Sequence, residues 1–210
     1  MYSNFENLNE EKKKTILDAC IHEFAAKGYE KASTNTIVKE AGISKGILFH
    51  YFKNKRGLFL YIVDYCIRTF VEEYDKYSLQ ETGDIFQRLS ELSVIKLKLT
   101  HANPGISKIL IEALENSQED IRSEVERRYS QLSSEYMPAF FKEIDYSKFR
   151  SGVNPSKAIE ILMLFLEALG DKYMKNYQGK GEELLQNYDK LMEEYNEYME
   201  ILMYGMYSEH

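Results

Sequence analysis

Apolar residues recur every three or four positions along almost the whole chain, and no stretch alternates apolar and polar residues as a strand would. This periodicity predicts α-helices over residues 10–27, 34–41, 45–51, 55–77, 84–100, 106–116, 118–143, 156–177 and 182–205. Proline occurs only at positions 104, 138 and 155, and Pro138 is expected to kink or restart the helix that contains it. The pattern therefore predicts an all-α fold.

The two shortest predicted helices, 34–41 and 45–51, need support from their neighbours, because an isolated helix below about 12–15 residues is marginal in water. The side chain of Ser33 or Thr34 suits the N-cap of the first helix, and Ser44 suits that of the second. Gly42 ends the first helix, because glycine adopts the left-handed conformation without a steric penalty. Two short helices joined by a tight turn are typical of a helix-turn-helix.

The distribution of charge supports contact with nucleic acid, although the chain has a net charge of −7. Residues 1–60 contain ten Lys or Arg and seven Asp or Glu, which gives +3, whereas the other 150 residues contain 17 and 27, which gives −10. Within residues 31–60, six basic side chains accompany one acidic side chain, that of Glu40. A local basic face favours contact with phosphates. The charge split therefore indicates a DNA-binding head on a separate, acidic body.

An ordered series of short motifs runs from Lys13 to Val63. Its members are Ile16-Leu17-Asp18-Ala19, Phe24, Lys27-Gly28-Tyr29, Thr34, Ile37-Val38, Ala41-Gly42-Ile43-Ser44-Lys45-Gly46, Phe49-His50-Tyr51-Phe52-Lys53-Asn54-Lys55 and Leu58-Phe59. The series resembles the DNA-binding part of the TetR family of bacterial transcriptional regulators, except that Phe49 stands where the family usually carries tyrosine. The resemblance implies a three-helix helix-turn-helix head over residues 1–54, and a helical bundle for ligand binding and dimerisation over residues 55–210.

The resemblance also implies that the helix over residues 45–51 enters the major groove of DNA. Candidates for contacts with phosphates are Thr34, Ser44, Lys45, Tyr51 and Lys55. Candidates for reading bases are Phe49, His50 and the Lys45-Gly46 stretch, because an aromatic ring packs on a thymine methyl and an ammonium group donates to guanine. Gly46 costs about 1 kcal/mol relative to alanine inside a helix, and close approach of the backbone to DNA is a reason to keep it.

The predicted helix over residues 156–177 is apolar on nearly all sides. A helix of this kind must be buried on all sides, which in a small bundle is easiest if one side packs on a second subunit. The last helix can pair with it, so that two helices from each chain would form a four-helix interface. This pattern predicts a homodimer, and the alternative is a monomer that buries both helices in its own core.

The resemblance further implies a pocket for a small-molecule effector in the body. Its candidate lining residues are His101, Ile111, Tyr136, Met137, Phe140, Phe141, Met163, Glu167 and Tyr173. The alternative for each aromatic or methionine side chain is ordinary core packing. Glu167 is an acid in an apolar helix, so it could bind a cationic ligand, pair across the dimer or extend to water.

No constellation of residues points to catalysis, a metal or a cofactor. The four histidines are scattered, so they suggest neither a metal site nor a Ser-His or Cys-His pair. Cys20 and Cys66 each lie in an apolar helical pattern and are expected to be buried and reduced. No apolar run is long enough to cross a bilayer and the N-terminus is polar and acidic, so we expect a cytoplasmic protein without a membrane partner.

These observations predict a transcriptional regulator that is not an enzyme, needs no cofactor and binds double-stranded DNA as a homodimer. The resemblance implies that it is a repressor released by a small molecule. The alternatives are a regulator that responds to a protein partner or to no ligand, and an activator. A helical enzyme or ligand carrier that retains the head would need a polar constellation in the body, and the sequence offers none.

Overall fold

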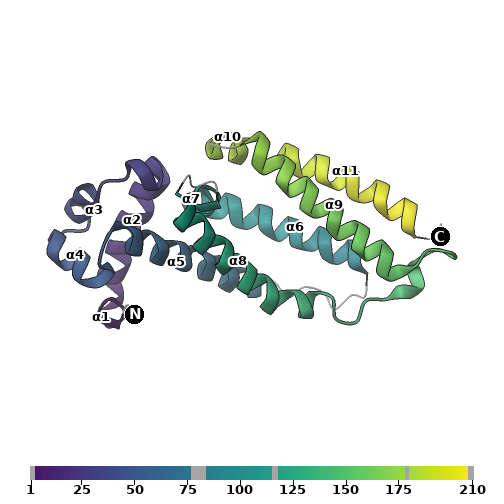
Figure 1. The fold of residues 1–210 in the computed structure, drawn as a ribbon, viewed down its shortest axis with the longest axis horizontal. Coiled ribbons are helices and arrows are strands. Elements are labelled where there is room, and N and C mark those ends of the chain that lie inside the picture. The colour runs from purple at the N-terminus through teal and green to yellow at the C-terminus, as the bar shows by residue number, and fades with distance from the viewer. Residues whose placement is uncertain (1–2, 77–83, 115–117, 178–179, 208–210) are drawn as a thin grey trace. The chain divides into compact units, whose positions relative to one another are not determined.

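The computed structural model describes residues 3–76, 84–114, 118–177 and 180–207. In these ranges the chain forms α-helices joined by turns, with one short 3-10 helix and one isolated bridge between Phe149 and Tyr207 (Figure 1). The predicted all-α fold is confirmed.

The chain divides into two compact units. The first comprises Met1–Glu73 and Asn103–Tyr129, and the second comprises Tyr74–Ala102 and Ser130–His210. The first unit thus contains the predicted head together with helices that follow it in the chain. The expected division at residues 54 and 55 stays a prediction.

The first unit is built around the helix-turn-helix. Its elements are α1 (Ser3–Glu6), α2 (Glu10–Lys31), α3 (Thr34–Glu40), α4 (Lys45–Phe52), most of α5 (Lys55–Asp75), α7 (Pro104–Leu114) and the first half of α8 (Glu119–Phe140). Ile37 of α3 and Leu48 and Phe52 of α4 are at most 1% exposed, and they pack with α2 and α5 in one core. Leu48 and Phe52 therefore face the core of the head.

Helix α1 was not predicted from the sequence, because four residues are too few to show a period. Phe5, in its middle, is fully buried. Its ring lies with centroids 4.8 Å from Phe52, 5.3 Å from Tyr61 and 5.7 Å from Tyr51. The carboxylate of Glu6 accepts a hydrogen bond of 2.6 Å from the Tyr61 hydroxyl. The N-terminal segment is therefore an integral part of the head.

The second unit has its own core. Its elements are α6 (Ile85–Ala102), the rest of α8, the 3-10 helix η1 (Tyr146–Lys148), α9 (Pro155–Asn176), α10 (Gly181–Gln186) and α11 (Tyr188–Met206). Buried residues of α6, α8, α9 and α11 pack together in it, among them Ile85, Phe140, Leu162 and Met199. Asp84 caps α6 and also accepts hydrogen bonds from Lys148 Nζ at 2.7 Å and the Tyr207 hydroxyl at 3.0 Å.

Two helices differ from their predicted course. Helix α8 continues through Pro138 and ends two residues later, at Phe140, rather than at the predicted residue 143. The chain therefore does not restart at Pro138, and the kink stays a prediction; helix propagation ending so soon after a proline fits the loss of its N–H donor. The predicted last helix is divided into α10 and α11 at Asn187. The Asn187 side chain donates to the carbonyl of Glu183 at 2.8 Å, and such local bonds compete with helix propagation.

Cys20 and Cys66 are both free and fully buried, as predicted. Burial disfavours the thiolate and raises the pKa of each thiol to about 12. Both side chains therefore remain protonated at neutral pH and act as small core residues. Among the described residues, no helix is long and apolar enough to span a membrane.

Candidate nucleic-acid interface

The turn between α3 and α4 is built by caps at both helix starts. The Ser33 hydroxyl accepts from the backbone of Thr36 at 3.4 Å, and the Ser44 hydroxyl accepts from Ile47 at 3.3 Å. Gly42 has a φ of 65°, in the left-handed region that its place after α3 requires. The helix-turn-helix geometry predicted from the sequence is therefore present, and Ser33 rather than Thr34 is the cap.

The outer side of α4 carries the candidates for reading bases. Lys45, Gly46 and His50 are exposed, and Phe49 is half-buried. The Lys45 ammonium lies 5.8 Å from the centre of the Phe49 ring, so a cation and an aromatic surface are presented together. The Nε2 atom of His50 lies 3.0 Å from the amide nitrogen of Asn4.

Gly46 occupies open space in this outer face. A Cβ atom added there would meet only the Ser44 hydroxyl oxygen, at 3.8 Å, which is an ordinary contact. The folded chain therefore has no steric need for glycine at position 46.

The other candidates for phosphate contacts make contacts within the head. Thr34 is half-buried at the start of α3, and Tyr51 is half-buried with its ring edge on Phe5. The Lys55 ammonium donates to the carbonyl of Glu30 at 3.0 Å and lies 5.0 Å from the centre of the Tyr29 ring. Lys55 thus helps to hold α5 against the end of α2, a structural task that its sequence position did not reveal.

Two carboxylates hold residues 28–33, which comprise the end of α2 and its connection to α3. Glu23 accepts from the backbone N–H of Ser33 at 2.7 Å, and Glu112 of α7 accepts from Tyr29 at 2.8 Å. Gly28 has a φ of 66°, and a Cβ atom there would lie 2.9 Å from a Glu112 carboxylate oxygen. Sequence reasoning missed both glutamates, because Glu112 is 83 residues from its partner and no local pattern marks such a contact.

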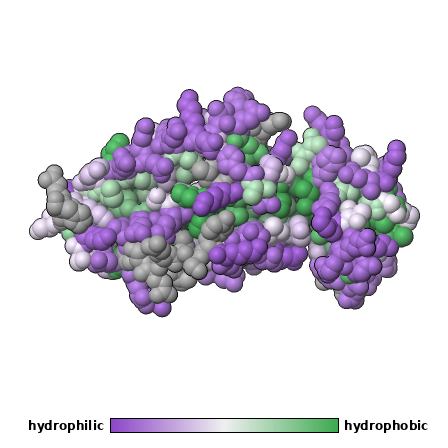
Figure 2. All heavy atoms as spheres, turned by 180° about the vertical axis from the view of Figure 1, so that it is seen from behind, coloured by the Kyte–Doolittle hydropathy of each residue, from purple (hydrophilic) through white to green (hydrophobic). Residues whose placement is uncertain are grey.

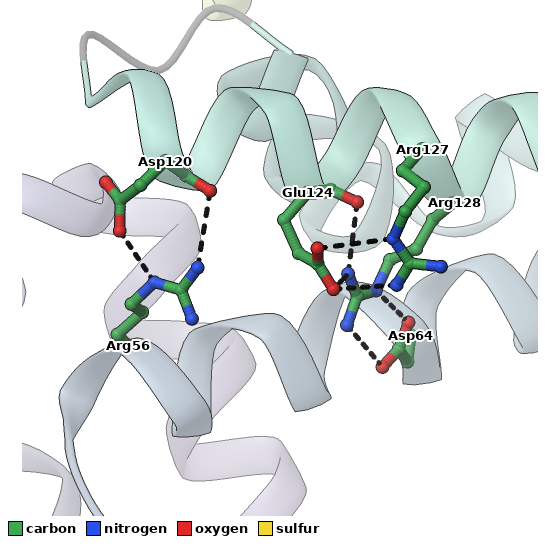
Figure 3. Close-up of polar contacts among 6 residues, drawn as sticks. All are labelled: Arg56, Asp64, Asp120, Glu124, Arg127 and Arg128. Atoms are coloured by element: carbon green, nitrogen blue, oxygen red, sulfur yellow. Dashed lines mark hydrogen bonds and ion pairs between the residues drawn. The ribbon is translucent and has the colours of Figure 1, made fainter.

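Ion pairs connect α5 to α8 (Figure 3). Arg56 donates to the Asp120 carboxylate at 2.7 Å. Arg128 is the most buried member, with 16% of its side chain exposed, and it contacts Asp64 and Glu124 at 2.5 Å each. Hydrogen bonds from Arg127 and then from Arg128 lower the pKa of Glu124 to about 2. These contacts fix α8 against the helix that follows the recognition helix.

The predicted effector-site residues are dispersed. Ile111 belongs to the first unit and the others to the second. Phe140 is buried in the core, and its ring lies edge-on to that of Phe141 at 5.3 Å. The side chain of Met137 lies outside the described residues, and Tyr136 and Met163 are half-buried.

The polar members of this predicted set have partners or face solvent. His101 lies 2.9 Å from Asp189, and the Tyr173 hydroxyl donates to Glu194 at 3.0 Å. Glu167 is exposed. In the part of the chain that is described, no group of His, Cys, Asp and Glu is arranged to hold a metal ion. The effector site stays a prediction.

Comparison with known families matches both parts of the chain. The family described as bacterial regulatory proteins, tetR family, matches residues 16–62. A second, described as a tetracyclin repressor-like C-terminal domain, matches residues 83–207. Among characterised relatives, the nucleoid occlusion factor SlmA of Marinobacter nauticus is 23% identical over 175 residues, which cover 81% of this chain and 87% of SlmA.

Solved structures share the fold. A TetR family transcriptional regulator from Chloroflexus aurantiacus has a TM-score of 0.60 and 22% identity, covering 99% of this chain and 98% of that one. The regulator FadR from Bacillus subtilis, solved in complex with stearoyl-CoA, has a TM-score of 0.56 and 16% identity, covering 90% and 97%. At these identities the likeness is one of fold alone.

The ion pairs that Glu124 makes with Arg127 and Arg128 predict an acid-dependent contribution to stability. Because the pKa of Glu124 falls from its usual 4.5 to about 2 in the folded protein, the contribution is complete above pH 4.5 and is lost as the pH falls towards 2. Arg128→Met should lower the free energy of unfolding by about 1–2 kcal/mol at pH 7. Urea denaturation at several pH values should show this difference shrinking below pH 4.5.

Arg122→Met is the matched control, because Arg122 pairs with Glu119 on the exposed side of the same helix. Its effect at pH 7 should stay within about 0.5 kcal/mol. An Arg128→Met difference that is constant or grows as the solution is acidified would contradict this assignment.

Proposed function

The chain belongs to the TetR family of bacterial regulatory proteins and is a DNA-binding transcriptional regulator, and from that premise we propose that it is a repressor that binds a near-palindromic site as a homodimer and is released by a small molecule. The observation that carries the DNA-binding part is Gly46. It lies exposed in α4, where alanine would fit the protein and would stabilise the helix. Close approach of the α4 backbone to DNA explains why glycine is kept.

The surroundings of Gly46 have the chemistry that DNA requires. Lys45 supplies a positive charge, the capped start of α4 supplies backbone N–H groups, and Phe49 and His50 offer surfaces for base edges. Ser44, Thr34, Tyr51 and Lys55 complete the proposed contact surface. The internal bonds of Lys55 make it a support for the head as much as a phosphate contact.

A homodimer is proposed from the apolar side chains that α9 and α11 leave exposed. Ile161 and Leu164 of α9 are 53% and 59% exposed, and Ile201 and Tyr204 of α11 are 68% and 75% exposed. Each pair is spaced by three residues, so its members share one helix face. Figure 2, the view from behind, shows that hydrophilic side chains cover most of the face in view, with some apolar side chains exposed among them. Burying such side chains would favour association.

The two exposed pairs belong to helices that contact each other. The Phe165 and Tyr198 rings lie 5.4 Å apart, and Lys172 pairs with Glu194 at 2.9 Å. Two such helix pairs from two chains would form the four-helix interface expected from the sequence. A dimer would present two α4 helices to successive major grooves, about 34–36 Å apart.

Release by a small molecule is proposed from the family, whose members are typically controlled by such effectors. The effector must bind more tightly to a conformation in which the two α4 helices no longer fit the site. By linkage, DNA then weakens effector binding by the same factor. The predicted residues of α6, α8 and α9 remain the proposed place for it.

Gly46→Ala tests the DNA-binding surface. The substitution should raise the free energy of unfolding by up to about 1 kcal/mol, because alanine is the better helix former. It should also weaken binding about tenfold to a duplex that the wild-type protein selects from a random-sequence library, because the added methyl group obstructs close approach. Urea denaturation and fluorescence anisotropy measure the two effects.

Gly170→Ala is the matched control. Gly170 is exposed inside α9 with nothing near its Cβ position. It follows Ile161 by nine positions, which places it on the opposite side of the helix. The control should gain similar stability and bind the selected duplex as the wild type does. Tight binding by Gly46→Ala would remove the main support for the proposed surface.

The double substitution Leu164→Asp with Ile201→Asp tests the dimer. Charged side chains on this face should convert the dimer to a monomer in sedimentation experiments and weaken binding to the selected duplex. Val94→Asp, at a 46% exposed position on α6, is the control and should remain dimeric. A wild-type protein that sediments as a monomer at micromolar concentration would refute the proposed dimer.

A further inference from the structure

His50 on the outer side of α4 is held by a residue from the opposite end of the head's sequence. Its Nε2 atom lies 3.0 Å from the side-chain nitrogen of Asn4, which precedes it by 46 residues. Both residues are exposed, so this contact contributes little to the core. What the contact does is fix the orientation of the imidazole ring.

The backbone next to Asn4 is firmly anchored. Phe5 is fully buried among three aromatic rings, and Glu6 accepts the short hydrogen bond from Tyr61. An exposed hydrogen bond between two mobile side chains would lose much of its strength to conformational entropy. Here α1 holds one partner and α4 the other, so that cost is reduced.

The chemistry of the two groups determines the tautomer of the ring. The amide nitrogen of asparagine only donates, so Nε2 of His50 must accept and carries no proton. In a neutral imidazole the proton is then on Nδ1. The second ring nitrogen of this exposed side chain is therefore an N–H donor.

We propose that Asn4 is a specificity-determining positioning residue, which fixes the tautomer and orientation of His50 so that its Nδ1–H selects a hydrogen-bond acceptor on a base edge. An acceptor such as N7 or O6 of guanine would be favoured over the amino group of cytosine. Without Asn4 the ring could present either a donor or an acceptor. This inference rests on the proposed function, because it requires α4 to lie in the major groove.

Selection from a random-sequence duplex library tests the role in specificity. Asn4→Ala should recover a site that has lost its preference at one base pair in each half, and it should bind the duplex selected by the wild type about three- to tenfold more weakly. Binding to a duplex of unselected sequence should change less than twofold. In a His50→Ala background, Asn4→Ala should have no further effect.

Asn7→Ala is the matched control, because Asn7 is exposed in the same segment. It should recover the wild-type site with wild-type affinity. If Asn4→Ala does so too, the inference is wrong while the proposed function stands. If the wild type itself selects no sequence, the proposed function fails instead.

The tautomer can be measured without DNA by two-bond nitrogen–proton NMR correlations of the imidazole. In the neutral ring of the wild type, the proton of His50 should be on Nδ1. Asn4→Asp replaces the donor by an acceptor, so the proton should move to Nε2. A wild-type ring protonated on Nε2, or a spectrum unchanged by Asn4→Asp, would overturn the inference.

Discussion

Helices of seven and eight residues, such as α3 and α4, do not persist alone in water, so every function of the head depends on the burial of their inner sides. Ile37, Leu48 and Phe52 supply that burial against α2 and α5. Fully burying such a side chain stabilises by about 1.5–3 kcal/mol, which exceeds the roughly 1 kcal/mol of a helix cap. Because burial of the inner side chains stabilises α4, the residues on its outer side are free to serve the proposed contact with DNA. These residues include Gly46, which weakens the helix.

The same division appears in the polar contacts of the first unit. The contacts that hold the connection between α2 and α3 come from Glu23, Lys55 and Glu112, which belong to three different helices. The ion pairs of Arg56 and Arg128 connect α5 to α8 (Figure 3). In the chain, α7 follows α6 of the second unit directly, and α8 begins in the first unit and ends in the second. A change in the second unit therefore has covalent routes to the first. The Glu112 carboxylate accepts a hydrogen bond from the backbone of Tyr29, so a shift of this carboxylate would displace the backbone that leads into α3.

Local patterns in the sequence predicted what local physics determines. The caps at Ser33 and Ser44 and the left-handed Gly42 all depend on residues within one turn of each other. Helix α1, the division at Asn187 and the partners of Glu112 and His50 depend on contacts that no period reveals. The predicted effector-site residues share only their type and their place in amphipathic helices, where core packing and ligand contact produce the same pattern. Phe140 illustrates this ambiguity, because it is buried in the core of the second unit.

The central claim is that the outer face of α4 binds the phosphates and bases of DNA although the whole chain is acidic. It is tested most directly by measuring how affinity for the selected duplex falls with KCl concentration for the wild type, Lys45→Ala and Lys175→Ala. Each lost phosphate contact should reduce the slope of log affinity against log salt by about 0.9, so Lys45→Ala should reduce it by about 2 per dimer. Lys175→Ala, which removes an exposed lysine from α9, should leave the slope unchanged. Equal slopes for all three proteins would contradict the claim.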